Sequence, residues 1–158
     1  KPSSAASDVY KRQVYHGMDE KDVQYFLKYP FNMIGADAGV SNGKGMPHPR
    51  TYGTNARVLG KYVREEKLIG LEEAVRRMTS LPAQKFQLKG RGLLKEGMAA
   101  DILIFDELTV ADLSTFEQPH QYSKGFRYVI VNGRLVIDEG VHNGERSGKP
   151  LYGPAKLF

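Results

Sequence analysis

The chain contains no cysteine among its 158 residues. It therefore forms no disulfide and offers no thiolate to a metal ion, and its composition does not indicate a redox compartment. Long apolar runs are also absent, so no stretch would span a bilayer and we expect no membrane partner. The sequence begins at Lys1 without an apolar leader segment. We therefore expect a chain that has been processed or cut from a longer one.

Clustered charge is also missing. The 23 Lys and Arg residues outnumber the 18 Asp and Glu residues, which gives a net charge of +5, but they are scattered along the sequence. Scattered basic charge is typical of a solvated surface, so we expect no nucleic-acid partner. The length suits one ordinary domain or a part of a larger one.

The first segment with a clear pattern leads to a candidate catalytic residue. After residues 1–17, where we expect a loop or a severed connection, Asp19 predicts the start of a helix that Pro30 ends. The short apolar run within residues 31–39 predicts a buried strand. Asp37 falls where that strand would end, and parallel α/β folds hold reactive groups at such strand ends. The alternative is an Asp that bonds its own backbone and starts a turn.

A loop rich in Gly, Ser, Asn and Pro follows at residues 40–50. Its position just after Asp37 would place this loop over the same face of the sheet. His48 could there approach the reacting groups near Asp37. The prolines on either side of His48 equally favour a rigid turn that carries an exposed histidine.

Helical patterns then return. Thr51 predicts the cap of a helix whose apolar side includes Val58 and Tyr62. Residues 71–78 predict a second helix with one apolar stripe, and Ser80, with a proline two positions on, predicts a further short turn. We interpret these apolar stripes as core.

From residue 89 the pattern changes to β structure. Residues 101–106 predict a strand, and residues 128–137 predict a hairpin. We place its turn at Asn132-Gly133. Both central residues of such a tight turn need positive φ, and Asn and Gly tolerate positive φ best. A long connection separates the predicted strand from the hairpin. The chain thus divides near residue 88 into an α/β part and a small β part.

The glycine-punctuated sequence at residues 90–106 resembles the C-terminal signature of the amidohydrolase superfamily. Four further stretches resemble the N-acyl-D-amino-acid deacylases (D-aminoacylases). They are Met-Ile-Gly-Ala-Asp at 33–37, His-Pro-Arg-Thr-Tyr-Gly-Thr at 48–54, Met-Thr-Ser-Leu-Pro-Ala at 78–83 and Thr-Phe-Glu-Gln-Pro-His at 115–120. Two alanines depart from the family pattern, at position 36 where we expect Ser and at position 38 where we expect Gly.

The resemblance implies a metal-dependent (β/α)8 barrel joined to a small β-sandwich. Such a barrel needs about 250 residues. The resemblance therefore assigns residues 1–88 to the C-terminal segment of the barrel and residues 89–158 to the C-terminal half of the β-sandwich domain. We expect an α/β fold whose main partner is the remainder of its own polypeptide, in a cytoplasmic enzyme.

The resemblance also implies a reaction, the metal-dependent hydrolysis of the amide bond of N-acyl-D-amino acids. Asp37 matches the family's catalytic aspartate at the end of the last barrel strand and is a candidate shared metal ligand. His48 and Arg50 are candidate substrate-binding residues. Arg50 could attract the substrate carboxylate or pair with a structural acid.

The family's other metal ligands, a His-x-His pair, later histidines and a cysteine, have no counterpart in this chain. We therefore expect one or two zinc ions in the complete enzyme but none held by the isolated chain, which should be inactive. Two alternatives stay open. One is an amidohydrolase of the dihydropyrimidinase type that acts on cyclic amides, and the other is a non-catalytic C-terminal fragment or assembly module.

Overall fold

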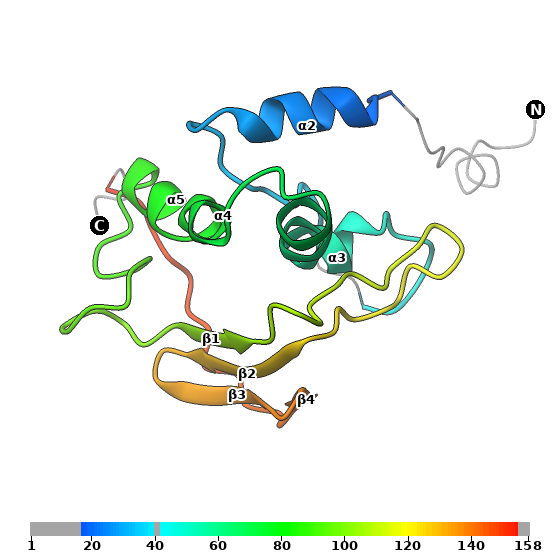
Figure 1. Cartoon of the computed structure of the whole chain (residues 1–158). Helices are drawn as coiled ribbons and strands as arrows, with labels where there is room; N and C mark the ends of the chain where they lie inside the picture. The colour runs from blue at the N-terminus through cyan, green and yellow to red at the C-terminus, as the bar shows by residue number, and fades with distance from the viewer. Residues whose placement is uncertain (1–16, 40–41, 155–158) are drawn as a thin grey trace, which may run out of the picture.

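The helices of the described residues lie on one side of a four-stranded antiparallel sheet, and the first of them lies farthest from it (Figure 1). The computed structural model describes residues 17–39 and 42–154. The loop predicted at residues 1–17 lies almost entirely outside the described residues. No helix in the described part of the chain is long and apolar enough to cross a membrane.

Helix α2 (Glu20–Lys28) forms where its cap predicts. The Oδ1 atom of Asp19 accepts a hydrogen bond from the backbone N–H of Lys21 at 2.8 Å, and the first turn is acidic, which suits the positive end of the helix dipole. Leu27 is its buried residue. The helix ends before Pro30, as predicted.

The strand predicted within residues 31–39 is absent, and that prediction is wrong. This segment is assigned no strand, and its backbone bond to the helical layer runs from the N–H of Ile34 to the carbonyl of Arg77 at 3.2 Å. An extended segment becomes a strand only beside another strand that exchanges hydrogen bonds with it. Within the described residues, the segment lies against helices instead (Figure 1).

Helix α3 (Arg50–Arg57) continues directly into a π-helix, η1 (Val58–Glu65). Thr51 is not its cap, contrary to the prediction. The helix begins one residue earlier after Pro49, whose φ of −50° is already helical and which has no N–H to satisfy. The predicted apolar side is confirmed, since Val58 and Tyr62 are buried.

Helix α4 (Leu71–Met78) confirms the predicted helix, but Val75 of its predicted apolar stripe is exposed rather than in the core. Helix α5 (Ser80–Lys85) forms where we predicted only a short turn. Arg77 of α4 is 2% exposed. It donates hydrogen bonds to the carbonyl of Leu27 and, at 2.7 Å, to Oε1 of Glu73. A buried guanidinium needs such partners, and this one ties the end of α2 to α4.

The sheet has the strand order β1-β2-β3-β4, with every neighbouring pair antiparallel. Its strands are β1 (Ile102–Phe105), β2 (Phe126–Val131), β3 (Arg134–Asp138) and β4 (Val141–His142). The predicted hairpin is confirmed. Asn132 and Gly133 have φ of 49° and 78°, so the turn uses the two residues that tolerate these values best.

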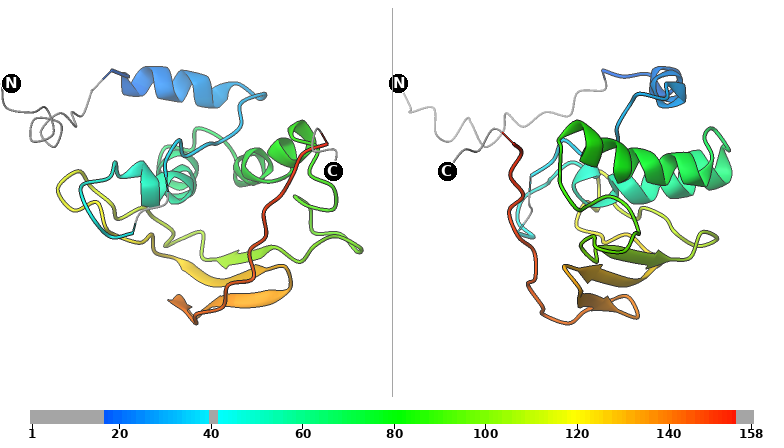
Figure 2. Two further views of the ribbon diagram at one scale, coloured as in Figure 1. Left: turned by 180° about the vertical axis from the view of Figure 1, so that it is seen from behind. Right: turned by 90° about the vertical axis from the view of Figure 1, so that its left-hand side faces the viewer.

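The connection from Asp106 to Gly125 leaves the sheet and packs on the helices (Figures 1 and 2). Val110 in this connection is 1% exposed and belongs to one core with Leu59 and Tyr62. Residues before and after position 88, where we predicted the division of the chain, therefore share one hydrophobic core.

The chain returns to the helices a second time at its end. After β4 it runs from the sheet toward α5 (Figure 2). The side-chain amide of Asn132 donates to the carbonyl of Ser147 at 2.7 Å, which fixes the first part of this return.

Candidate active site

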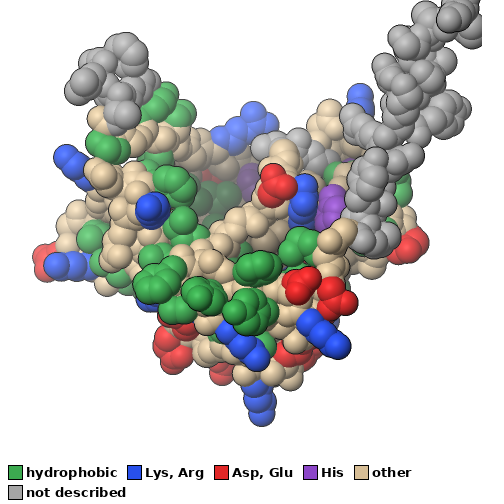
Figure 3. Space-filling view, turned by 90° about the horizontal axis from the view of Figure 1, so that it is seen from above, with side chains coloured by type: hydrophobic (Ala, Val, Ile, Leu, Met, Phe, Trp, Pro, Cys, Tyr) green, Lys and Arg blue, Asp and Glu red, His purple; other side chains and the backbone are tan. Residues whose placement is uncertain are grey.

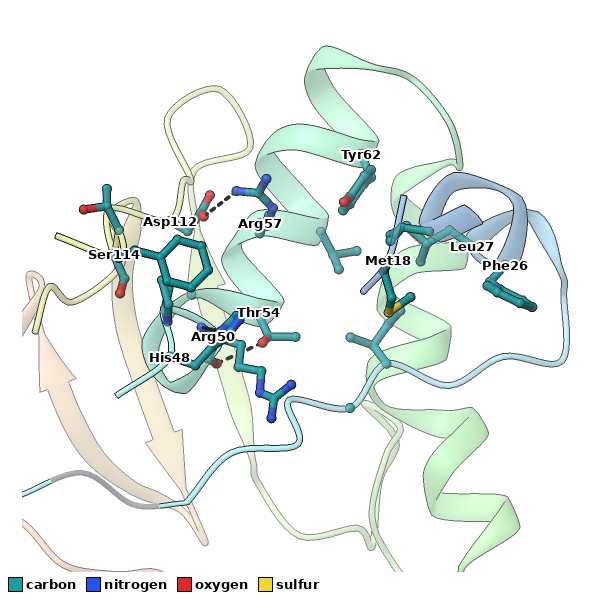
Figure 4. Close-up of a pocket in the computed structure, with 18 of the residues that line it drawn as sticks. Met18, Phe26, Leu27, His48, Arg50, Thr54, Arg57, Tyr62, Asp112 and Ser114 are labelled. Atoms are coloured by element: carbon teal, nitrogen blue, oxygen red, sulfur yellow. Dashed lines mark hydrogen bonds and ion pairs between the residues drawn. The ribbon is translucent and has the colours of Figure 1, made fainter. Parts of the chain in front are cut away.

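A cavity of about 700 Å³ opens between α2, α3 and the connection that follows β1. One wall is the polar side of α3, with Arg50 and Arg57, and the opposite wall is apolar, with Met18, Phe26 and Leu27 (Figure 4). Seen from above, histidine, basic and acidic side chains gather around a hollow in the surface (Figure 3). A partly apolar cavity of this volume with a few polar groups suits a small-molecule ligand.

Asp37 and Arg50, two of the residues predicted from sequence, meet at the rim of this cavity. The Nη2 atom of Arg50 lies 2.9 Å from Oδ2 of Asp37. Arg50 lines the cavity, whereas the Asp37 side chain is 89% exposed beside it. Asp37 has a φ of 46°, in the left-handed region that Asp and Asn tolerate better than most residues. This backbone turn brings its carboxylate to Arg50.

His48 also lines the cavity. Its Nδ1 atom accepts the backbone N–H of Arg50 at 3.1 Å, and its ring lies edge-on to Phe116 with 5.0 Å between centroids. Partial burial, and then the positive charge of Arg50, hold the pKa of His48 below its ordinary value. Because Nδ1 accepts the Arg50 N–H, the proton of the His48 ring lies on Nε2. The structure therefore places all three predicted site residues at one rim.

The cavity also holds a charged pair, Arg57 and Asp112, that was not predicted from the sequence. Nη1 of Arg57 lies 3.1 Å from Oδ2 of Asp112 (Figure 4). Burial opposes the charge of Arg57, but the hydrogen bond and charge of Asp112 raise its pKa above the ordinary value. Gly53 makes this approach possible, because a Cβ there would lie 2.8 Å from Cβ of Asp112. Asp112 belongs to a connection without periodicity, so no sequence pattern pointed to it.

The described residues do not form a metal site by themselves. Residues 17–39 and 42–154 contain no group of three His, Cys, Asp or Glu side chains that could hold a metal ion. Their histidines lie apart, with His48 at the cavity, His120 beside Tyr52 and His142 on β4. From the described residues, Asp37 could add one carboxylate to ligands supplied from elsewhere.

Comparison with known proteins supports the resemblance of the sequence motifs. The model of the amidohydrolase family matches residues 27–137. The chain belongs to the amidohydrolase family. The matched range includes the three predicted site residues at the cavity rim, strands β1 and β2, and β3 as far as Ile137.

Individual relatives of this amidohydrolase chain narrow the comparison. D-aminoacylase from Alcaligenes xylosoxydans xylosoxydans is 46% identical over 138 residues, which cover 87% of this chain and 28% of the relative. A crystal structure of D-aminoacylase has a TM-score of 0.80 at 44% identity and covers 85% of this chain and 28% of its own. The N-acyl-D-glutamate deacylase of Bordetella bronchiseptica was solved with zinc and a phosphonate inhibitor. Its structure has a TM-score of 0.71 at 45% identity, and the match covers 75% of this chain and 25% of the deacylase.

The amidohydrolase chain thus spans less than a third of the length of these relatives. The expected α/β fold class is confirmed, because helices and an antiparallel sheet superpose on part of an amidohydrolase barrel enzyme. The family resemblance inferred from the motifs is confirmed as well.

Proposed function

We propose that this chain is part of a metal-dependent hydrolase that cleaves the amide bond of N-acyl-D-amino acids, to which it contributes Asp37 as a catalytic residue. The observation that carries the proposal is the ion pair between Asp37 and Arg50 at the rim of a ligand-sized cavity. It occurs in a chain that is 46% identical to a D-aminoacylase. The metal is zinc, as in the related N-acyl-D-glutamate deacylase solved with that ion.

Amide hydrolysis needs a polarised carbonyl, a nucleophilic water near neutral pH and a proton for the departing nitrogen. A zinc ion, when bound, supplies the first two and lowers the pKa of its water to about 7. The third requirement, a proton for the departing nitrogen, is met by Asp37. Its exposed carboxylate takes a proton from the attacking water and delivers it to the amine nitrogen.

Arg50 binds the carboxylate of the substrate. A guanidinium has five N–H donors, so one arm holds Asp37 while the other side of the fork receives a second carboxylate. His48 lies next to it in the cavity wall and presents Nε2–H as a further donor. The two side chains would orient an acyl amino acid toward Asp37.

The remaining zinc ligands come from the rest of the polypeptide, because the described residues lack a ligand cluster. The division into a barrel segment at residues 1–88 and a β-sandwich half at residues 89–158 belongs to the same proposal. The isolated chain would then be one piece of an enzyme.

The test is a substrate panel on the full-length protein loaded with zinc. N-acetyl-D-methionine, N-acetyl-D-glutamate and N-acetyl-D-aspartate are compared with their L enantiomers and with the cyclic amide dihydrouracil. We expect turnover of at least one D substrate, none of the L substrates, and loss of activity after chelation. Turnover of dihydrouracil alone would replace this proposal with the cyclic-amide alternative.

A companion assay uses the isolated 158-residue chain with added zinc. We expect no hydrolysis of N-acetyl-D-amino acids, and hydrolysis would contradict our assignment of the metal ligands to the rest of the polypeptide. An isolated chain that is monomeric, unfolds cooperatively and remains inactive, together with an inactive full-length protein, would favour an assembly module.

A further inference from the structure

His120 lies where three segments of the chain meet. Its Nε2 atom is 2.8 Å from the carbonyl oxygen of Gly45, and its Nδ1 atom is 3.0 Å from Oη of Tyr52. A carbonyl oxygen can only accept, so Nε2 of His120 donates to Gly45, while the tyrosine hydroxyl can serve Nδ1 as donor or acceptor. Both ring nitrogens are used, which fixes the orientation of the His120 ring.

The residues after His120 hold Tyr52 as well. The Tyr52 ring lies edge-on to His120 and to Tyr122, with centroids 5.8 Å and 5.5 Å away. The hydroxyl of Ser123 donates to the carbonyl of Tyr52 at 3.0 Å. Residues 120–123 therefore contact the first turn of α3 through Tyr52.

These contacts close a short segment that carries the candidate substrate ligands. Gly45 and Tyr52 are the two ends of residues 45–52, and His48 and Arg50 lie between them in the cavity wall (Figure 4). Within this segment the start of α3 is held by its own bonds, such as that from the N–H of Thr51 to the carbonyl of His48 at 2.9 Å, whereas Gly45 and Met46 before it are exposed loop residues. His120 joins its two ends through one imidazole ring.

We propose that His120 is a positioning residue, which acts through residues 45–52 to hold Arg50 at the place where it meets Asp37 and the substrate carboxylate. This inference rests on the proposed function. A binding group must be held to about 0.5 Å to act efficiently, and Arg50 is the first residue of α3, directly after the exposed loop whose Gly45 carbonyl His120 binds. The second contact from the same connection, Phe116 against the His48 ring, supports the same segment.

The test uses the full-length enzyme and the substitutions His120→Ala and His120→Gln. Alanine removes both hydrogen bonds, whereas the glutamine amide offers one donor and one acceptor, as the neutral imidazole does. The matched control is His142→Ala, since His142 is also exposed but lies on β4. Three measurements are made on each protein: steady-state kinetics with an N-acetyl-D-amino acid, amide hydrogen exchange of residues 42–50, and thermal unfolding.

For His120→Ala we expect a KM raised about tenfold, a smaller change in kcat, and faster exchange within residues 42–50. The factor corresponds to two net hydrogen bonds of about 1 kcal/mol each that are partly transmitted to Arg50. His120→Gln should restore most of the affinity, and His142→Ala should match the wild type in its kinetics and hydrogen exchange. If His120→Ala does not fold, Tyr52→Phe removes one of the two bonds and should show the same changes to a smaller degree.

The inference is overturned if the full-length enzyme is active and His120→Ala, or Tyr52→Phe in its place, keeps the wild-type KM, whatever happens to the exchange. A purely structural role would lower thermal stability without raising KM and overturns it too. An inactive wild-type enzyme would instead reject the proposed function. In that case unchanged exchange in residues 42–50 would show that His120 does not hold the segment.

Discussion

Arg50, at the start of α3, holds Asp37 through an ion pair of 2.9 Å although both side chains face solvent, with exposed fractions of 46% and 89%. Ion pairs this exposed contribute little to stability. Substitutions at either residue should therefore report on binding and catalysis rather than on folding.

Replacing Asp37 with Asn in the full-length enzyme should lower kcat by a factor on the order of 10² to 10⁴, because Asn cannot carry the proton. Asn is nearly isosteric and tolerates the φ of 46° at this position, so the fold and most of the metal content should be kept. Steady-state kinetics measure kcat, circular dichroism checks the fold, and elemental analysis measures the zinc content. Wild-type turnover would remove Asp37 from the mechanism.

Replacing Arg50 with Met should raise KM for N-acyl-D-amino acids at least about tenfold, because a charge-assisted bond to the substrate carboxylate is lost. Arg50→Lys should recover only part of the affinity, since it keeps the charge but not the fork. The control is Arg127→Met on β2, where the arginine pairs with Glu139 away from the cavity. Equal effects of Arg50→Met and Arg127→Met would argue for a general charge effect.

Replacing Gly60 with Ala should destabilise the protein by about 1–3 kcal/mol through overpacking. This is opposite in sign to the usual gain of about 1 kcal/mol for Gly to Ala within a helix. A Cβ at Gly60 would lie 2.8 Å from the carbonyl oxygen of Val110 and 3.2 Å from Nη2 of Arg64. Gly148→Ala, where no heavy atom lies within 4 Å of the new Cβ, is the control. Denaturant unfolding of the full-length protein measures both, and a stabilised Gly60→Ala would contradict the contact.

The hydrogen bonds of Glu73 should make the stability of the protein depend on pH. Hydrogen bonds with Arg76 and then Arg77 lower the pKa of Glu73 from 4.5 to about 2. A lowered pKa in the folded state means that its contribution to stability is complete above about pH 4.5 and is lost as the pH falls toward about 2. The wild type should therefore melt at a higher temperature than Glu73→Gln near neutral pH. This difference should shrink between about pH 4.5 and pH 3, and a difference independent of pH would reject the ionic contribution.

Local signals predicted those elements whose geometry is decided by neighbouring residues. The cap at Asp19 and the Asn132-Gly133 turn formed as predicted, because each depends on the backbone preferences of a few adjacent positions. The predicted strand at residues 31–39 did not form, since a strand depends on a partner that no local pattern supplies. Thr51 failed as a cap because Pro49 already begins the helix.

The candidate site was predicted by residue but not by arrangement. Motifs pointed to Asp37, His48 and Arg50, yet their meeting depends on a left-handed residue and on contacts from a distant connection. Asp112 and His120 lie in that aperiodic connection, where spacing carries no structural information. Only folding shows which of its side chains face the cavity.

The connection from Asp106 to Gly125 starts and ends in the sheet, yet it delivers Asp112, Ser114 and His120 to the cavity wall or to its support. Hybrid proteins that join the helical half of one relative to the sheet half of another at residue 88 would therefore inherit a mixed cavity rim. Their ligand preference should depend on the parentage of both halves. Engineering of this scaffold would then have to redesign residues 106–125 together with α3, as one unit.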